Sequence, residues 1–178
     1  MTSFDLQQLV PDMLERIPEI KPAYEAIAQE YREAVEHWTT QDFQEIRTIE
    51  QLHHMSASDP SRPGMTIVME RLVTQFLVDL AVQGNGQRRL AEITAWIEDL
   101  AQSEIFDIRN LVAVSVCEPL VTTYEDHLPH ILPFLGDSTK ELCRMQLLSY
   151  RVSEETKKLL LPPHGQDNRQ IRRSRKHK

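Results

Sequence analysis

The stretch Asp107–Leu120, DIRNLVAVSVCEPL, decides the fold class. A helix over this stretch, at about 100° per residue, would place four polar side chains on one narrow stripe: Asp107, Asn110, Ser115 and Glu118. Apolar side chains cover the rest of the circumference, so the pattern predicts a nearly buried helix with one polar seam. Such a seam must be paired with backbone groups or directed at a partner, because an unpaired buried polar group costs about 1–3 kcal/mol.

The composition favours helices throughout the chain. Only five of the 178 residues are glycine, and the segments between the Gly and Pro residues are rich in Leu, Ala, Glu, Gln and Arg, which are good helix formers. The period-two alternation that half-buried strands require is almost absent. With 40% hydrophobic residues, the chain can bury the core of one domain. We therefore expect an all-α protein.

Amphipathic stripes at three- and four-residue spacing divide the chain into expected helices. These helices cover residues 3–16, 22–38, 40–52, 65–83, 88–100, 107–120, 138–148 and 153–161. The short loops between consecutive helices place neighbours antiparallel. We therefore expect an antiparallel helical bundle in which the central helices, between residues 65 and 120, stack in a HEAT-like, α-solenoid-like manner.

Two breaker-rich or charged segments set the expected domain organisation. The segment 56–64, SASDPSRPG, reads as a surface loop that divides the N-terminal helices from the central bundle. Residues 1–163 are expected to form a single helical domain, and residues 164–178 a disordered basic tail. This tail holds six basic residues and one acidic residue, so its formal charge is +5. Since the whole chain has a formal net charge of −7, residues 1–163 carry −12.

The last helices carry recognisable start signals. Ser138 and Glu141 fit a capping box at the start of a helix, and Leu142, Met145 and Leu148 are expected to face inward from it. Ser153 is expected to begin a last helical turn.

Histidines provide little sign of a metal site. The adjacent His53 and His54 would point about 100° apart on a helix, whereas two ligands of one metal need i,i+3 or i,i+4 spacing. His127 and His130 have that spacing, but Pro129 distorts their segment and no second pair of this kind occurs. We expect no metal and no other cofactor.

The two cysteines give no catalytic pattern either. Cys117 and Cys143 each lie on an apolar helical face, where buried thiols are the expected state and a disulfide between them is the alternative. Lys140 and Arg144 could lower the pKa of the Cys143 thiol, but no histidine is placed to act as its base.

One glycine-rich turn resembles an anion-binding loop in part. Gly84-Asn85-Gly86 precedes Arg88 and Arg89 at an expected helix start, where backbone amides can bind an anion. The preceding strand and the Lys-Ser/Thr ending of a P-loop are missing from the sequence. A plain helix–helix turn is therefore expected.

The N-terminus does not have the pattern of a signal peptide. Asp5, Pro11 and Asp12 stand where a signal peptide needs a basic start and an apolar centre. The longest apolar runs are also far shorter than the roughly 20 residues of a membrane-spanning helix. We expect a cytoplasmic protein without a membrane partner; the sequence indicates no oligomeric state.

Several stretches together resemble a known kind of protein. They are Arg88–Leu90, Ile97–Leu100, Asp107–Ser115 and Glu118–Leu120, with Ile17–Ile20, Tyr24 and Leu132–Leu142 at either side. This set resembles a family of small, uncharacterised bacterial helical domains that are similar to immunity proteins of contact-dependent and polymorphic toxin systems. The resemblance implies a helical fold and a protein partner, and it implies no catalytic residues. The chain departs from the family pattern by an extra stretch at about 33–64 and by the basic tail.

Three classes of function stay open. The expected one is a non-catalytic protein-interaction domain of the immunity type, which binds and neutralises a toxin. An acidic body would steer a basic nuclease toxin toward it. The alternative is a nucleic-acid-associated adaptor whose tail binds phosphates without regard to sequence; the acidic body argues against this as the main role. An enzyme with a helical metal or thiol site has the least support.

The candidate contact residues follow from the first two classes. For a protein partner they lie near the end of the expected helix 88–100 and along the polar seam: Asp99, Glu104, Asp107, Asn110 and Glu118. For a polyanion they lie in the basic tail: Arg172, Arg173, Arg175 and Lys176.

Overall fold

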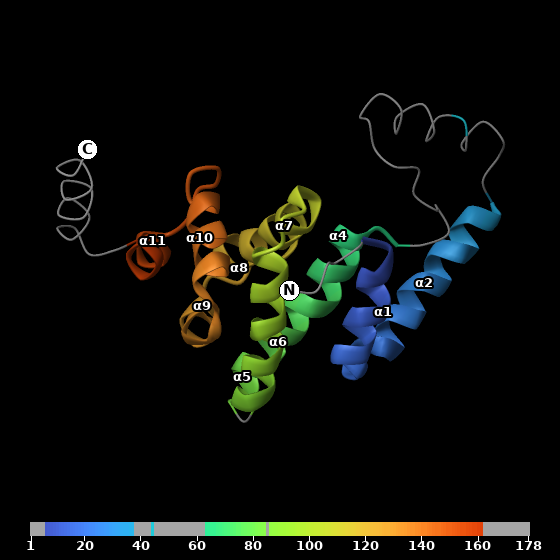
Figure 1. Ribbon diagram of the computed structural model, residues 1–178, viewed down its shortest axis with the longest axis horizontal. Helices are drawn as coiled ribbons and strands as arrows, with labels where there is room; N and C mark the ends of the chain where they lie inside the picture. Colours follow the sequence, from blue (N-terminus) through green and yellow to red (C-terminus); the bar gives the residue numbers. More distant parts are fainter. Residues whose placement is uncertain (1–5, 38–43, 45–62, 85, 162–178) are drawn as a thin grey trace.

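The computed structural model describes residues 6–37, 44, 63–84 and 86–161, and every regular element in these ranges is helical. The all-α prediction is therefore confirmed. The helices follow one another along the long axis of the molecule, from α1 and α2 at one end to α11 at the other (Figure 1). Apart from residue 44, the helix predicted over 40–52 lies outside the described residues, as does most of the loop 56–64.

Two of the N-terminal elements have a proline in their first turn. Helix α1 (Leu6–Arg16) is followed by a 3-10 turn, η1 (Pro18–Ile20), and by α2 (Lys21–Glu36). Pro18 and Pro22 each stand in the first turn of an element, where the missing N–H needs no intrahelical partner. The interruption between the helices predicted over 3–16 and 22–38 is thus present, at Pro18, and α1 continues through Pro11.

The next helical rod contains a wider turn. Helices α4 (Met65–Val68) and α5 (Gln75–Gln83) are joined by a π-helical segment, η2 (Met69–Thr74). Gly84 ends α5 in the left-handed conformation, with a φ of 70°, which glycine adopts at little cost. Helix α6 (Gln87–Ala101) then contacts α5, as expected for neighbours joined by a tight turn.

The stretch that decided the fold class is also interrupted by a π-helical segment. It comprises α7 (Phe106–Val112), η3 (Ala113–Cys117) and α8 (Glu118–Thr122). The segments η2 and η3 contact each other. There the Thr74 hydroxyl donates a hydrogen bond of 2.7 Å to the carbonyl oxygen of Ser115 inside the core. Two wide turns are therefore paired by a buried side chain.

The C-terminal part consists of short helices. They are α9 (Leu128–Ile131), the 3-10 turn η4 (Leu132–Phe134), α10 (Asp137–Gln146) and α11 (Glu154–Leu160). The prediction that Leu148 faces inward was wrong, because α10 ends at Gln146 and leaves this side chain 90% exposed. Met145 is exposed as well, whereas Leu142 packs against the core.

The predicted capping box at the start of α10 was also wrong. The cap residue is Gly136, and the carboxylate that accepts from the first turn belongs to Glu98 of α6. Glu98 accepts from the amides of Ser138 and Thr139, both at 2.9 Å, and from the Thr139 hydroxyl at 2.7 Å. A side chain 40 residues earlier thus replaces the expected local cap.

The core runs through all these helices, with Trp96 of α6 among its largest fully buried side chains. The indole Nε1 of Trp96 donates to Asp12 at 2.8 Å, which fixes α1 against α6. Within the described ranges, no helix combines the length and apolarity that crossing a membrane would require.

Candidate interaction surface

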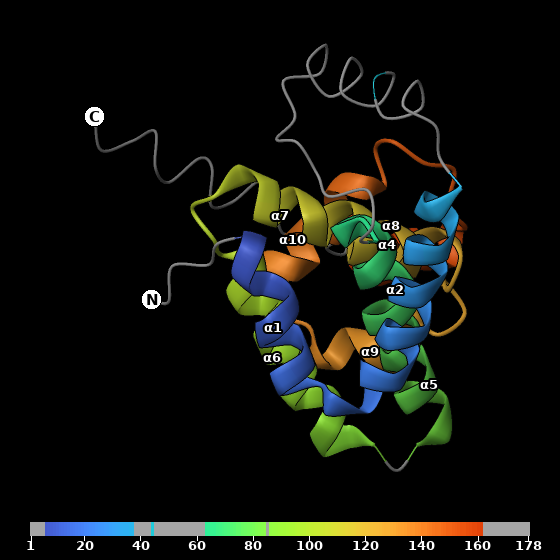
Figure 2. The same ribbon diagram turned by 90° about the vertical axis from the view of Figure 1, so that its right-hand side faces the viewer.

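Two large apolar side chains are exposed where α6 turns into α7. Phe106 is 67% exposed and Ile105 is 40% exposed, whereas Ile108, one turn later, is fully buried. Exposed acidic and polar residues surround the pair along the chain. We call this surface the α6–α7 corner, and it comprises Asp99, Glu104, Ile105, Phe106, Asp107 and Asn110. Figure 2 shows the connection between the two helices at the outer edge of the molecule.

Hydrogen bonds fix the backbone of the corner. The Ser103 hydroxyl oxygen accepts from the amide of Ile105 at 3.2 Å, and Arg109 donates from Nη1 to the carbonyl oxygen of Ser103 at 2.5 Å. Ile105 itself has an extended conformation and caps α7. The corner is therefore an ordered projection that presents an aromatic side chain without requiring a partner to order it first.

Four of the five residues predicted to contact a protein partner lie in or beside the connection between α6 and α7. Asp99 lies in the last turn of α6, Glu104 in the connection, and Asp107 and Asn110 in α7, and all four are exposed. The negative charge of the corner is thus in contact with solvent. It lies next to the exposed Phe106, a combination that offers an apolar anchor with a charged rim.

Glu118 does not belong to this group. It is half-buried on α8, and a hydrogen bond from the Tyr150 hydroxyl to its carboxylate raises the pKa of Tyr150. The predicted seam fails at Ser115 too, since Ser115 is fully buried and its Oγ has no hydrogen-bond partner among the described residues. Ser115 lies inside η3 and Glu118 directly follows it, and a π-helical turn changes the angular positions of its own residues and of those after it.

The exposed pair Ile105 and Phe106 was missed in the sequence. The predicted helix boundaries placed the pair in a loop between residues 100 and 107. Helical periodicity cannot predict which side chains of a loop are buried or exposed. The available signal was composition alone: two adjacent bulky apolar residues between Glu104 and Asp107, in a connection too short to fold back over them.

Comparisons with known proteins place the chain in a family. A family model described as "Domain of unknown function (DUF7674)" matches residues 10–149. The chain belongs to this family. Membership of an uncharacterised family, which the resemblance implied, is thus confirmed, whereas no curated protein and no solved structure matches the chain. The DUF7674 match includes the α6–α7 corner and ends before α11.

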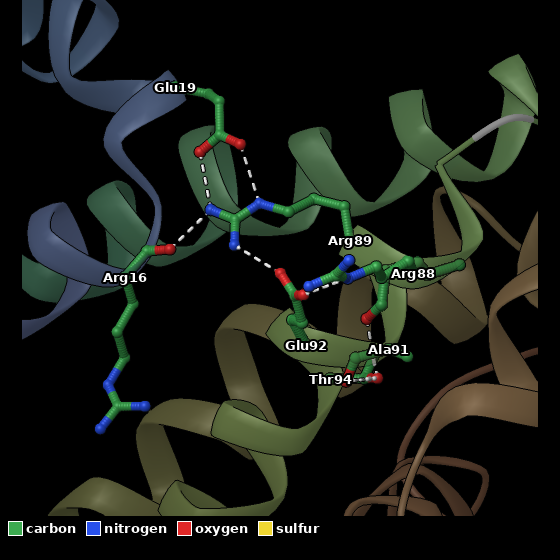
Figure 3. A network of polar contacts seen from close by, with 8 residues as sticks. Arg16, Glu19, Arg88, Arg89, Ala91, Glu92 and Thr94 are labelled. Carbon is green, nitrogen blue, oxygen red and sulfur yellow. Dashed lines mark hydrogen bonds and ion pairs between the residues drawn. The ribbon is translucent and has the colours of Figure 1, made fainter.

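The arginines after the glycine turn serve the packing of this DUF7674 domain. Arg89 donates to both carboxylate oxygens of Glu19, at 2.8 and 2.7 Å, and to Glu92 at 3.1 Å (Figure 3). It also donates to the carbonyl oxygen of Arg16 at 2.5 Å. The hydrogen bonds from Arg89 hold the pKa of Glu19 below its ordinary value. Arg89 therefore clamps the end of α1 and the turn η1 onto α6.

Arg88 is engaged as well, since it donates to Glu92 at 3.0 Å. Beside this clamp lies a cavity of about 120 Å³ lined by Arg16, Ile17, Arg89, Glu92, Ile93 and Trp96. A water molecule takes up roughly 30 Å³ of liquid, so the cavity has room for a few waters. Arg89 thus serves the clamp, and Arg88 forms an ion pair on the surface of α6. The turn between α5 and α6 joins two helices in contact, as expected.

The remaining sequence candidates are the histidines and the basic tail. No group of three or more His, Cys, Asp or Glu residues there is arranged to hold a metal ion. His127 is half-buried and His130 is exposed. The pair His53 and His54 and the tail residues lie outside the described residues; the tail residues are Arg172, Arg173, Arg175 and Lys176.

Proposed function

We propose that this protein is a non-catalytic protein-interaction domain that binds its partner through the α6–α7 corner. The observation that carries the proposal is the exposed Phe106, held on a hydrogen-bonded connection and flanked by Glu104 and Asp107. Burying an exposed aromatic ring is a common source of affinity at protein interfaces, and the surrounding carboxylates favour a partner with basic residues around an apolar pocket.

An immunity-type role is the form of this function that we favour. The residues before the basic tail carry a formal charge of −12, which would speed the approach of a basic toxin such as a nuclease. The sequence resemblance to bacterial immunity proteins supports the same role. A bacterial cytoplasm is the place where such a protein would meet its toxin.

We further propose that the central helices form an antiparallel, HEAT-like stack that supports the corner. In support, α5 contacts α6, and α6 contacts both α7 and α10. Short connections join α5 to α6 and α6 to α7, and such connections favour antiparallel neighbours. In this arrangement the corner is one of the interhelical turns along one edge of the stack.

The experiment uses the full chain as bait in its source cell, followed by affinity measurement with the purified partner. We expect Phe106→Ala to weaken the complex by about tenfold or more, because it removes the aromatic anchor. The matched control is Val82→Ala, which truncates another exposed apolar side chain, 63% exposed at the end of α5. Equal affinities of the two variants would refute the corner as the binding surface.

Charge and tail variants test the class of partner. Neutralising Asp99, Glu104 and Asp107 together should slow association and weaken its dependence on salt if the partner is basic. The nucleic-acid alternative predicts instead that deleting residues 164–178 abolishes retention of DNA or RNA at low salt. Turnover of a substrate by the purified protein would contradict the non-catalytic proposal.

A further inference from the structure

The two cysteines of the chain meet between two packed elements. Cys117 is the last residue of η3, Cys143 lies in α10, and η3 and α10 are in contact. Both side chains are fully buried. The cysteines are separated by 25 residues along the chain, so their proximity is a result of tertiary packing.

A hydrogen bond defines how the Cys117 thiol lies. The Cys117 thiol donates to the carbonyl oxygen of Thr139 at 3.5 Å. Thr139 precedes Cys143 by one turn of α10, so both side chains reach the same face of that helix. The Cys117 sulfur therefore lies against the turn of α10 that leads to Cys143, and both buried thiols belong to the contact between η3 and α10.

The surroundings keep Cys117 in its thiol form. Burial, the neighbouring Cys143 and the negative charge of Glu98 all raise the pKa of the Cys117 thiol. A protonated thiol is a weak nucleophile, so the pair is stable as two thiols in a reducing compartment. Bulky thiol reagents cannot reach fully buried sulfur atoms, whereas a water-sized oxidant can enter during brief local openings.

We propose that Cys117 and Cys143 form a reversible oxidation site, at which a hydroperoxide converts the two thiols into an intramolecular disulfide. This inference does not depend on the proposed partner-binding function. The disulfide would link η3 covalently to α10. It would lie close to Thr139, which contacts both Cys117 and Glu98.

The chemistry balances with hydrogen peroxide as the oxidant. During a local opening one thiol loses its proton, and the resulting thiolate attacks a peroxide oxygen, so that the O–O bond breaks. The products are a sulfenic acid and hydroxide, which takes up the released proton to give one water. The second sulfur then attacks the sulfenic sulfur, forms the S–S bond and releases the second water. The two thiols lose two electrons and two protons, and the peroxide takes up both.

The test is peroxide treatment of the folded full chain, followed by digestion without reductant and mass spectrometry. We expect the peptides that carry Cys117 and Cys143 to appear as one cross-linked species, two hydrogens lighter than the separate thiol peptides. A dithiol reductant should separate them again. The oxidised protein should contain no disulfide between chains, and its midpoint of thermal unfolding should rise by about 5–10 °C, because the cross-link restricts the unfolded chain.

Two single variants, Cys117→Ala and Cys143→Ala, control for oxidation of the six methionines, which peroxide also attacks. Neither variant can form the link, so neither should show the rise in thermal midpoint. Recovery of the two wild-type peptides as separate thiols, as sulfinic or sulfonic acids, or as disulfides between chains would overturn the proposal. A rise in the midpoint in either variant would overturn it too.

Discussion

At the starts of both α10 and α11, a carboxylate from another part of the chain accepts hydrogen bonds, yet the two helices depend on it to different degrees. At α10 the cap residue is Gly136, which has no side chain to offer, and Glu98 of α6 accepts the hydrogen bonds of the first turn. At α11 the Ser153 hydroxyl oxygen accepts from the amide of Thr156 at 3.1 Å. Glu125 then adds bonds from the Ser153 amide and the Thr156 hydroxyl.

The difference shows where tertiary structure replaces a local signal. Helix α11 has a cap that its own sequence encodes, so a distant carboxylate only reinforces it. Helix α10 has none, so its start forms only when α6 is in place. Gly136 is part of this arrangement, since a Cβ atom there would overlap the carboxyl group of Glu98.

The largest effect is expected from Glu98→Ala. The substitution leaves the amides of Ser138 and Thr139 and a buried hydroxyl without their acceptor, and we expect a loss of about 2–4 kcal/mol in the free energy of unfolding. Urea unfolding followed by circular dichroism measures it. The matched variant is Glu125→Ala at α11, for which a smaller loss is expected because Ser153 still caps the helix. Equal losses would contradict the distinction between the two helices.

Gly136→Ala tests the same contact from the opposite side. The added methyl group must displace Glu98, so we expect a loss of about 1–3 kcal/mol in the free energy of unfolding, typical of overpacking. Gly64→Ala is the control, because a Cβ atom at Gly64, the residue before α4, meets nothing within 4 Å. If the two alanine variants are equally stable, the close approach of Glu98 to Gly136 does not constrain the fold.

Acid should weaken α10 through Glu98. Burial alone would raise the pKa of Glu98, but hydrogen bonds from Thr139, Ser138 and Gln102 together lower it to about 2 from an ordinary value of 4.5. The unfolded chain therefore binds a proton before the folded chain does. The stabilisation is complete above about pH 4.5 and is lost as the pH falls toward 2.

Urea unfolding measured between pH 6 and pH 2.5 tests this expectation, with Glu98→Gln as the reference. Other carboxylates with lowered pKa values, such as Glu19 and Glu92, contribute to the acid sensitivity of both proteins. The wild type should therefore lose more stability than the variant over this range, and parallel curves would show that Glu98 contributes nothing to the pH dependence.

The same distinction explains how far the sequence predicts the molecule. Helix type, the break at Pro18, the stop at Gly84 and the start of α11 at Ser153 were predictable, because each follows from residues that are neighbours in the chain. The cap of α10 was not, since Ser138 and Glu141 match a local pattern that a contact with α6 overrides.

The candidate surface divides in a similar way. The exposure of Asp99 and Asp107 follows from charge and helical periodicity, and the structure has both on the surface. The positions of Ser115 and Glu118 do not follow from a uniform 100° per residue, because the wide turn η3 interrupts the helix. Pro119 cannot donate to the carbonyl oxygen of Ser115, which accepts from Thr74 of η2 instead.

The smallest effect is expected from Ser153→Ala. Loss of the cap should cost about 1 kcal/mol, and because α11 lies at the end of the molecule, the change should be local rather than global. Hydrogen exchange at the amides of Thr156 and Lys157 should become about fivefold faster, while exchange within α10 stays unchanged. If protection of α10 falls to the same extent, the two helices unfold as one unit. The bond from Arg144 of α10 to the carbonyl oxygen of Leu160 would then be the link that couples them.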